Sequence, residues 1–577
     1  MLYEKRNLPF ELWDIKVREA SDDELMIISD ERQLALSLDE MKRVQEFFQG
    51  LDRDPTDLEM EAIAQAWSEH CCYKSSWNVL KGNLFTIEAP QNLVVINADA
   101  AVIDFDEDFA YVVALESHNH PSALEPVGGA ETGIGGILRD VVCMGGQPIA
   151  LVDPLFFGPL DFPDAQVPEG TKHPTFIYRG VVHGIRDYGN RVGIPTVAGC
   201  VKYHEGYVTN CLVNVGCVGL ADKNKIIPSH ANAVGEILVM AGGRTGRDGI
   251  HGVSSLASQE LSAEREGSAR TAVQMGDAIT KEPLIHATLQ AIDQDLVSGC
   301  KDFGGGGLSS CAGEIAHGGG FGLRVELDKL KLKVKGMAPW EIWVSESQER
   351  MLFSIKPELV DEILALFKFW DVEAVVIGEI TDTGRAELFF EGVQVADLDL
   401  DFYSGAVRYN RPYVTREWTT QAEQYEAPAD LGQTLLALMA QPNIASQEWV
   451  IRQYDHEVRG KTVLKPLQGT ITRPGPGDAS LIKPRSDTFK GLALTSDVNP
   501  FITSQDPYWG GASAVEESFR NLVATGARPH SFCDNLCFGN PEKPDRMGDF
   551  VRATDGMFLV ADARSEEHTS ELQSPNT

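Results

Sequence analysis

The sequence predicts an α/β (α+β) protein that is built from a duplicated unit. Apolar runs typical of buried strands alternate with helical patterns along most of the 577 residues. A segment of twenty residues at 139–158 also recurs at 520–539, a shift of 381 positions, with eight residues identical. Because this period is far too long for a solenoid, we expect a duplicated domain and a pseudo-twofold arrangement of two related sites.

The length and the absence of long apolar runs limit the classes of protein to consider. A chain of this length is typical of about three to five domains. No apolar run reaches the ~18 residues of a membrane span, and residues 1–10 lack the apolar stretch of a secretory signal. We therefore expect a cytoplasmic protein with no membrane partner.

The charge and the cysteines exclude further classes. Acidic residues outnumber basic residues by 85 to 50, a net charge of −35, so a nucleic-acid partner is not expected because its phosphates would be repelled. A phosphorylated small molecule can still bind where metal ions, arginines or helix N-termini offset the field. A salty habitat or solubility explains the acidity equally well. The ten cysteines include no CxxC pair, which argues against structural zinc, iron–sulfur clusters and disulfides.

The first half of the chain divides into three segments. Residues 1–84 form a helical and linker segment, with predicted helices at 38–51 and 57–70. Residues 85–221 form a first α/β domain, with predicted strands at 93–97, 101–105, 111–115, 195–199, 207–214 and 216–220 and helices at 132–144 and 176–190. Residues 222–398 form a second α/β domain, with strands at 237–240 and 374–377 and helices at 281–294 and 357–369.

The second half repeats the first half only in part. Residues 399–446 contain several prolines and are predicted to be a connector with some helix. The pattern of the first domain recurs at 447–563 and includes a strand-like run at 557–561. Residues 564–577 lack an apolar period and are similar to a translated sequencing adapter, so we expect a non-native tail on a truncated chain. A genuine disordered tail is the alternative.

The most informative polar cluster follows the predicted strand 111–115. Residues 116–120 read Glu-Ser-His-Asn-His, a glycine-rich turn at 128–130 comes next, and Arg139 and Asp140 lie on the helix after it. Ligands of α/β sheets bind at the carboxyl ends of strands. Carboxylates, imidazoles and a guanidinium at such a position suit a magnesium-bridged polyphosphate and a proton transfer.

The internal repeat extends to the carboxylate of this cluster. Glu116 falls on Asp497 at the shift of 381, and the turn at 128–130 meets residues 510–512 after a slip of one residue. The segment 117–120 has diverged to Val-Asn-Pro-Phe at 498–501. We therefore expect chemistry in the first copy and nucleotide binding or a structural role in the second.

Candidate ligands of magnesium are carboxylates or amide oxygens at loop entries, because magnesium bound with phosphates keeps several waters. Four residues fit this description: Glu116, Asp140, Asp302 and Asn535. Asp302 precedes four successive glycines at 304–307, where backbone amides can approach an anion. For any single acid, a solvated or capping carboxylate is the commoner explanation, but the coincidence with glycine-rich turns and the repeat reverses that balance.

Other candidates have ordinary explanations when they are taken alone. His70 and Tyr73 end a predicted helix, where a histidine can complement the helix C-terminus. Residues 346–349 could form a surface turn, and Gln274 could be a capping residue. Motifs of other classes are absent, because the sequence has no GxxxxGK[ST], HExxH or GxSxG pattern.

These segments together resemble the phosphoribosylformylglycinamidine synthase family in its small synthetase form. The likeness spans residues 10–563 and rests on the motifs WSEHCCYKS, ESHNHPSALEP, GIGGILRD, GGRTGRDGIHG, VQMGD, SESQER and DNLCFGNPEKP. It implies the fold of the aminoimidazole ribonucleotide synthetase superfamily, with N-type and C-type domain pairs occurring twice. It also implies ATP-dependent conversion of formylglycinamide ribonucleotide and ammonia to the amidine through an iminophosphate, in de novo purine biosynthesis.

The resemblance implies a role for each candidate residue. His70 and His118 would be catalytic, with His118 as the proton acceptor. Magnesium would be arranged by Glu116, Asp140, Asp302 and Asn535, and ATP would contact Tyr73, Asp497 and Asp534. Substrate contacts would come from Ser117, His118, Asn119, His120, Arg139, Gln274, Glu346, Ser347, Gln348 and Cys537. Ammonia would arrive from a separate glutaminase subunit, bridged by a small accessory subunit.

The chain departs from the family pattern at three places. Ala114 stands where a lysine for ATP is usual, Cys537 stands where asparagine or serine is commoner, and the last C-type domain is missing. A kinase-like or selenophosphate-type synthetase of the same superfamily is a rival, which the repeat disfavours because such forms carry one domain pair. A nucleotide-binding scaffold without turnover is the rival from another class.

Overall fold

The computed structural model describes residues 2–95, 98–252, 272–405, 407–416 and 426–571, excluding the side chains of 565–571. An N-terminal segment begins the chain with the antiparallel strands β1 (Tyr3–Lys5) and β2 (Trp13–Ile15). Three helices follow: α1 (Asp22–Glu31), α2 (Leu38–Gly50) and α3 (Asp57–Ala66). Each of these helices starts with a capping box, which satisfies its first free amides.

The predicted single helix 57–70 is wrong, because the chain breaks it after Ala66. Trp67 ends α3, and the Ser68 hydroxyl accepts a hydrogen bond from the amide of Cys71 and starts the short helix α4 (Glu69–Cys72). This new start redirects the chain, and α5 (Trp77–Gly82) follows.

A six-stranded sheet forms the first α/β domain in the order β3-β4-β5-β8-β6-β7. Its strands are β3 (Asn92–Val94), β4 (Ala101–Asp104), β5 (Phe109–Ser117), β6 (Gln147–Phe157), β7 (Thr196–Tyr203) and β8 (Leu212–Asp222). The two strands predicted at 207–214 and 216–220 are in fact the single strand β8, preceded by a 3₁₀ turn. Helices α7 (Pro126–Cys143) and α8 (Pro174–Arg191) pack on one face of this sheet.

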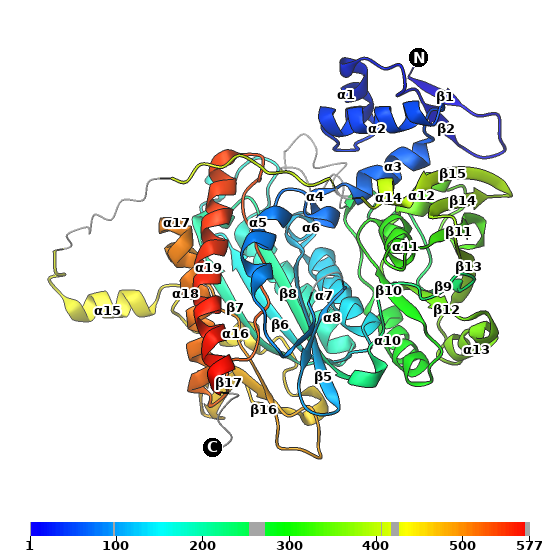
Figure 1. Cartoon of the computed structure of the whole chain (residues 1–577). Helices are drawn as coiled ribbons and strands as arrows, with labels where there is room; N and C mark the ends of the chain where they lie inside the picture. The colour runs from blue at the N-terminus through cyan, green and yellow to red at the C-terminus, as the bar shows by residue number, and fades with distance from the viewer. Residues whose placement is uncertain (1, 96–97, 253–271, 406, 417–425, 572–577) are drawn as a thin grey trace.

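A seven-stranded sheet forms the second α/β domain in the order β10-β12-β9-β13-β11-β14-β15. Its strands are β9 (Ile237–Gly242), β10 (Gly299–Phe303), β11 (Gly322–Glu326), β12 (Arg350–Ile355), β13 (Ala374–Thr381), β14 (Arg385–Phe390) and β15 (Val393–Asp399). Its helices are α10 (Ala278–Asp293), α11 (Gly307–His317), α12 (Pro339–Val344), α13 (Val360–Phe369) and α14 (Leu400–Tyr403). Helices α7, α8 and α10 lie between the two sheets and share one apolar core with them (Figure 1).

The second copy reproduces the helices of the first copy at the predicted shift. The bounds of α6 (Asn119–Leu124) and α17 (Pro500–Gln505) differ by 381 residues at both ends, as do those of α7 and α18 (Pro507–Ala524). The slip of one residue expected near 510 does not occur. The strands of the second copy are short: β16 (Thr462–Leu464), β17 (Leu467–Thr470), β18 (Arg473–Pro476), β19 (Ser480–Ile482) and β20 (Leu492–Leu494).

Two local predictions in the copies are wrong. The glycine-rich turn expected at 128–130 lies inside α7, where Gly129 allows close packing on α6, because a Cβ there would lie 2.6 Å from the amide nitrogen of Ser122. The strand expected at 557–561 lies inside α19 (Pro544–Glu571), which packs along α18. An apolar run of this length suits either state, and here the neighbouring element is a helix.

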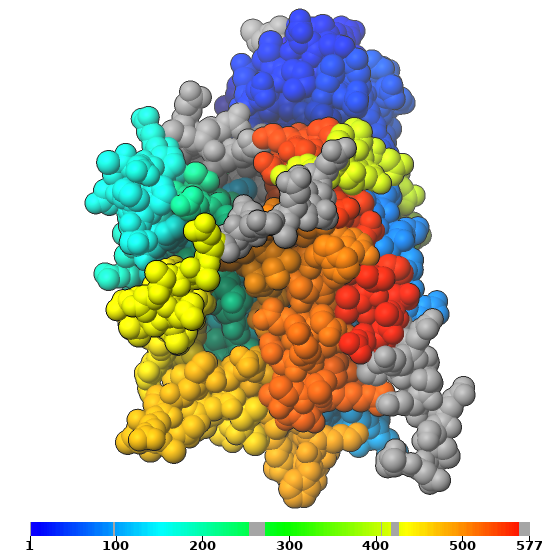
Figure 2. All heavy atoms as spheres, turned by 90° about the vertical axis from the view of Figure 1, so that its left-hand side faces the viewer, coloured from blue at the N-terminus to red at the C-terminus, as the bar shows by residue number. Residues whose placement is uncertain are grey.

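The connector contains α15 (Leu431–Met439) and α16 (Glu448–Ile451). Beyond it the second copy, coloured yellow-orange to red, covers one face of the molecule below the N-terminal helices (Figure 2). Ile482 and Leu492 of this copy pack on the face of the first sheet that α7 and α8 leave open. In the part of the chain that the structure describes, no helix is both long enough and apolar enough to cross a membrane.

Candidate active site

A cavity of about 2130 Å³ lies between the first sheet and the second copy. It collects most of the residues that the sequence predicted for the site. Those that line it are His70, Tyr73, Glu116, Ser117, His118, Asn119, His120, Arg139, Asp140, Gln274, Asp302, Asp497, Asp534, Asn535 and Cys537. The chain therefore brings together in space residues that are more than 460 positions apart in sequence.

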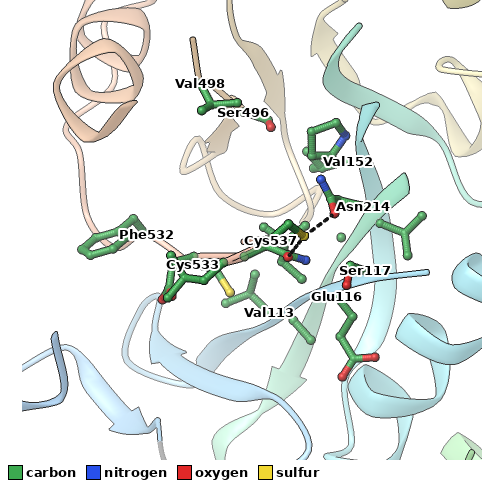
Figure 3. Close-up of a pocket in the computed structure, with 18 of the residues that line it drawn as sticks. Val113, Glu116, Ser117, Val152, Asn214, Ser496, Val498, Phe532, Cys533 and Cys537 are labelled. Carbon is green, nitrogen blue, oxygen red and sulfur yellow. Dashed lines mark hydrogen bonds between the residues drawn. The ribbon is translucent and has the colours of Figure 1, made fainter. Parts of the chain in front are cut away.

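The cavity is composite, because a segment of the second copy runs along β5 of the first copy. The Tyr111 hydroxyl is 2.8 Å from Nδ1 of His530 and 2.6 Å from Oγ of Ser531. Six residues after Ser531, the thiol of Cys537 lies 3.5 Å from Oδ1 of Asn214 on β8. Figure 3 shows this segment along β5, with Cys533 near Val113 and Cys537 near Ser117.

Three carboxylates, Glu116, Asp140 and Asp302, form an acidic group on one wall of the cavity. Glu116 is open to the cavity but surrounded by protein, and this burial, together with the charge of Asp302, raises its pKa to about 7. Burial and the neighbouring carboxylates also raise the pKa of Asp140 and of Asp302. Oδ2 of Asp140 is buried without a hydrogen-bond partner. This wall therefore holds acids whose charged forms the protein alone does not stabilise.

The acidic group fits a magnesium ion that arrives with phosphates better than an ion held by protein alone. Among the residues that the structure describes, no three His, Cys, Asp or Glu side chains are arranged to hold a metal by themselves. Magnesium in phosphate sites uses one or two carboxylates and completes its shell with water and phosphate oxygens. The unsatisfied oxygen of Asp140 and the mutual repulsion of the three acids are the features that such a cation would relieve.

Asn535, the fourth candidate ligand, lies on the second-copy segment. Its Oδ1 accepts a hydrogen bond from the thiol of Cys537 at 3.1 Å. The amide of Asn119 donates to the same sulfur at 3.4 Å. Cys537 therefore joins residues of both copies at the cavity wall.

His118 lies at the N-cap of α6, but its imidazole does not cap the helix. Its Nδ1 is 2.5 Å from the carbonyl oxygen of Gly129, which can only accept, so this nitrogen carries a proton. Its Nε2 lies 3.2 Å from Oε1 of Gln274. Burial lowers the pKa of His118 to about 4, against the raising effect of these two contacts. The ring is therefore neutral at pH 7, and its Nε2 can take up a proton. The protonated Nε2 would then donate a hydrogen bond to Oε1 of Gln274.

Gln274 is held in turn by the loop at 346–348. Its amide nitrogen donates to Oε2 of Glu346, whose Oε1 accepts from the amide of Gly306 at 3.0 Å. The chain of contacts thus runs from the imidazole of His118 to the glycine-rich start of α11. The alternative that Gln274 is only a capping residue does not fit these contacts.

The loop 346–348 is buried, so the predicted alternative of a surface turn is wrong. Its residues lie behind the cavity wall. The guanidinium of Arg139 donates to Oε1 of Gln348 at 2.7 Å and lies 3.7 Å from Oδ2 of Asp302. Gly304 leaves room for this guanidinium, because a Cβ there would lie 2.7 Å from Nη2 of Arg139 and would displace it. The Ser347 hydroxyl accepts from the amide of Gly246 at 2.8 Å.

His70 and Tyr73 reach the cavity from α4. Tyr73 ends this helix in the left-handed conformation, with φ of 51°, and its ring faces the cavity. Glu69 fixes the turn, because its carboxylate accepts from the amide of Ser75 at 3.1 Å and from the Ser75 hydroxyl at 2.7 Å. Burial lowers the pKa of His70. Both side chains therefore line the open cavity, where Tyr73 remains 53% exposed.

Asp497 and Asp534 line the same cavity from the second copy. Asp497 accepts hydrogen bonds from the Thr495 hydroxyl at 2.6 Å and from the Asn521 amide at 2.8 Å. Asp534 lies near the Tyr73 hydroxyl, and the two acidic charges of Glu116 and Asp534 help burial to raise the pKa of Tyr73. Burial raises the pKa of both aspartates.

The sequence reasoning missed two charged residues of the wall, Asp99 and Lys301. The ammonium of Lys301 contacts the carboxylate of Asp99 and lies 2.6 Å from Oε2 of Glu314. Lys301 directly precedes Asp302, and this position was a usable signal. Asp99 follows a short strand in a loop and had no signal, because its partners come from distant parts of the chain.

Comparison with known proteins gives consistent matches over almost the whole chain. Residues 97–221 and 476–563 match the family described as AIR synthase related protein, N-terminal domain, and residues 233–391 match the corresponding C-terminal domain. Residues 25–74 match the formylglycinamide ribonucleotide amidotransferase linker domain. The N-terminal domain thus occurs twice, which confirms the predicted duplicated fold.

Individual relatives agree with these domain matches. Phosphoribosylformylglycinamidine synthase subunit PurL of Thermoplasma acidophilum is 46% identical over 93% of this chain and 70% of its own length. The structure described as T. maritima PurL complexed with FGAR is 29% identical with a TM-score of 0.72, and covers 89% of this chain and 77% of that one. T. maritima PurL complexed with ATP is 27% identical with a TM-score of 0.68, over 91% and 76%.

Proposed function

This chain belongs to the phosphoribosylformylglycinamidine synthase family, among its PurL subunits, and on that premise we propose how its cavity works. The reaction is the ATP-dependent conversion of formylglycinamide ribonucleotide to formylglycinamidine ribonucleotide in purine biosynthesis, a carbon–nitrogen ligation. The observation that supports it best is the meeting of the acidic group, Arg139 and the His118–Gln274–Glu346 contacts in one cavity.

In the first step the γ-phosphate of ATP passes to the amide oxygen of the ribonucleotide and gives an iminophosphate. Glu116, Asp140, Asp302 and Asn535 would hold magnesium, which would offset the charge of the transferred phosphate. Tyr73, Asp497 and Asp534 would contact the nucleotide. Arg139 supplies a buried positive charge among these acids, since Asp302 and Glu349 outweigh the effect of burial and raise its pKa.

In the second step ammonia displaces phosphate from the iminophosphate carbon. His118 would accept the proton that the ammonia loses, because its Nε2 is unprotonated at pH 7 and Gln274 is placed to accept a hydrogen bond from the resulting imidazolium. Anionic phosphates in the cavity would raise the pKa of His118 and make it a better base. His70, which lines the same cavity, would be the second catalytic residue.

Substrate contacts are assigned to polar residues that line the cavity. They are Ser117, Asn119, His120, Arg139, Gln274 and Cys537. The predicted contacts Glu346, Ser347 and Gln348 are buried behind the wall, so this loop would act on the substrate through Gln274 and Arg139. Ammonia would come from a partner glutaminase, bridged by a small accessory subunit, as the family resemblance implies.

An assay of ADP release tests the function directly. The purified full chain is given ATP, magnesium and ammonium, with and without formylglycinamide ribonucleotide. We expect release of ADP and phosphate only when the ribonucleotide is present. Binding of ADP without any turnover would support the nucleotide-binding scaffold, and ribonucleotide-independent hydrolysis would contradict the assigned substrate.

A further inference from the structure

A buried ionic cluster sits directly behind the loop at 346–348. Oε1 of Glu349 accepts a hydrogen bond from the Tyr188 hydroxyl at 2.7 Å and another from the amide of Asp277 at 2.9 Å. Oε2 of Glu349 lies 2.7 Å from the ammonium of Lys281. The side chains of Glu349, Tyr188 and Lys281 are at most 2% exposed. None of these residues is assigned a contact with ATP or the ribonucleotide above.

The cluster joins the two α/β domains at a single carboxylate. Tyr188 belongs to α8 of the first domain, whereas Lys281 belongs to α10 of the second. Glu349 precedes β12 and has a φ of 64°, which costs an ordinary residue about 1–2 kcal/mol. Such a conformation persists only where contacts hold it, and here the contacts come from both domains.

The same cluster touches the helix that carries Arg139. Gly135 lies one turn before Arg139 on α7, and a Cβ there would lie 2.8 Å from the Tyr188 hydroxyl and 3.3 Å from Oε1 of Glu349. On the other side, Glu349 is the direct neighbour of Gln348, which accepts the hydrogen bond of Arg139 at 2.7 Å. The cluster therefore adjoins both partners of the Arg139–Gln348 contact.

A role in stability alone does not explain this arrangement. Taking charges out of water is costly, and well-packed apolar residues often replace a buried ion pair without loss of stability. Placing such a cluster behind a binding loop instead fixes geometry, because its hydrogen bonds are directional and fully buried.

We propose that Glu349, Tyr188 and Lys281 are positioning residues that hold the loop 346–348 against Arg139 and so set the affinity for formylglycinamide ribonucleotide. The inference rests on the proposed function, since that function assigns a ribonucleotide contact to Arg139, which donates a hydrogen bond to Gln348. The cluster acts through the loop and does not contact the reacting atoms.

The test compares two tyrosine variants that each lose one tyrosine–glutamate hydrogen bond of 2.7 Å. Tyr188→Phe removes the bond to Glu349, and the control Tyr3→Phe removes the exposed bond to Glu31 near the N-terminus. For Tyr188→Phe we expect the KM and Kd for the ribonucleotide to rise about tenfold. The kcat should change less than about threefold and the Kd for ADP should stay the same, a split that general destabilisation does not produce. Tyr3→Phe should match the wild type.

Hydrogen exchange of the peptide spanning 345–352 gives a readout that does not depend on substrate. Tyr188→Phe should exchange faster there than the wild type and Tyr3→Phe should not. Gly135→Ala should give the same pattern as Tyr188→Phe, because its new methyl group displaces the tyrosine hydroxyl.

The outcomes separate the inference from the function on which it rests. Wild-type ribonucleotide affinity in Tyr188→Phe overturns the positioning role, whatever the exchange shows. If the wild type binds ADP but no ribonucleotide, the proposed function fails instead. The exchange of 345–352 then decides whether the cluster holds the loop, and unchanged exchange overturns the inference.

Discussion

The two copies of the N-type domain use equivalent positions for opposite purposes. At the shift of 381 residues, Glu116 and Asp140 of the first copy correspond to Asp497 and Asn521 of the second. In the second copy the Asn521 amide donates to Asp497 at 2.8 Å, so the pair is satisfied internally. In the first copy both members are acids with raised pKa values, and one oxygen of Asp140 has no partner. The first copy thus keeps a pair of acids whose charged forms the surrounding protein does not stabilise.

The helix starts show the same contrast. Oδ1 of Asn499 accepts a hydrogen bond from the amide of Phe501 at 3.0 Å and caps α17. The equivalent residue of the first copy is His118, whose ring turns away from the amides of α6 toward Gln274. Local rules of stability are therefore followed in the second copy and broken in the first, as expected at a functional site.

Exchanging the helix caps should have the largest effect on turnover. His118→Asn gives α6 the cap of α17, which should raise the free energy of unfolding by about 1 kcal/mol. The same change removes the proton acceptor and should lower kcat about 1000-fold. Urea unfolding and the ammonium-dependent assay measure the two effects.

His118→Ala serves as the control for this exchange. Its kcat should fall as far as that of His118→Asn, but its free energy of unfolding should not rise, because alanine cannot cap a helix. Wild-type turnover in either variant would remove His118 as the proton acceptor and would leave the contrast between the copies purely structural.

Neutralising one member of the acidic pair Glu116 and Asp140 should have the next largest effect on turnover. Asp140→Asn copies Asn521 into the first copy, removes like-charge repulsion against Glu116 and should raise the free energy of unfolding by about 1 kcal/mol. Turnover should fall about 100-fold, and stabilisation by added magnesium and ADP should weaken. Calorimetry and the ammonium-dependent assay measure these changes.

Asp153→Asn is the matched control, because Asp153 is a buried aspartate of the same domain that does not line the cavity. Its turnover should stay within about threefold of the wild type. If Asp140→Asn kept full turnover or lost stability, Asp140 would be an ordinary structural acid and the two pairs would not differ in purpose.

Features encoded locally could be predicted from the sequence. Capping residues and apolar period located helices such as α2 (Leu38–Gly50), α8 (Pro174–Arg191) and α10 (Ala278–Asp293) close to their observed bounds. The repeat at a shift of 381 positions predicted the duplicated domain. Glu116, His118 and Arg139 were found because polar residues followed a buried strand, and the structure places all three on one cavity.

Features that depend on distant partners could not be predicted. The glycines at 128–129 suggested a turn, but Gly129 serves the packing of α7 on α6. The loop at 346–348 looked like a surface turn because its partners, Gln274 and Arg139, lie about 70 and 210 positions away. A single sequence shows the composition of a segment and its periodicity, but it does not show which remote side chain will cover it.

The reverse exchange in the second copy should have the smallest effect on turnover and gives the sharpest test of the comparison. Asn521→Asp recreates the acidic pair beside Asp497, with Glu517 also nearby. It loses the 2.8 Å hydrogen bond and adds a like charge, so we expect the free energy of unfolding to fall by about 2 kcal/mol. The control Asn521→Ala loses only the hydrogen bond, so its free energy of unfolding should fall by about 1 kcal/mol. Salt should restore part of the loss in the aspartate variant alone, because only that loss is electrostatic. Equal stability of the two variants at low salt would mean that the second copy tolerates an acidic pair, and the amide at 521 would then have no neutralising role.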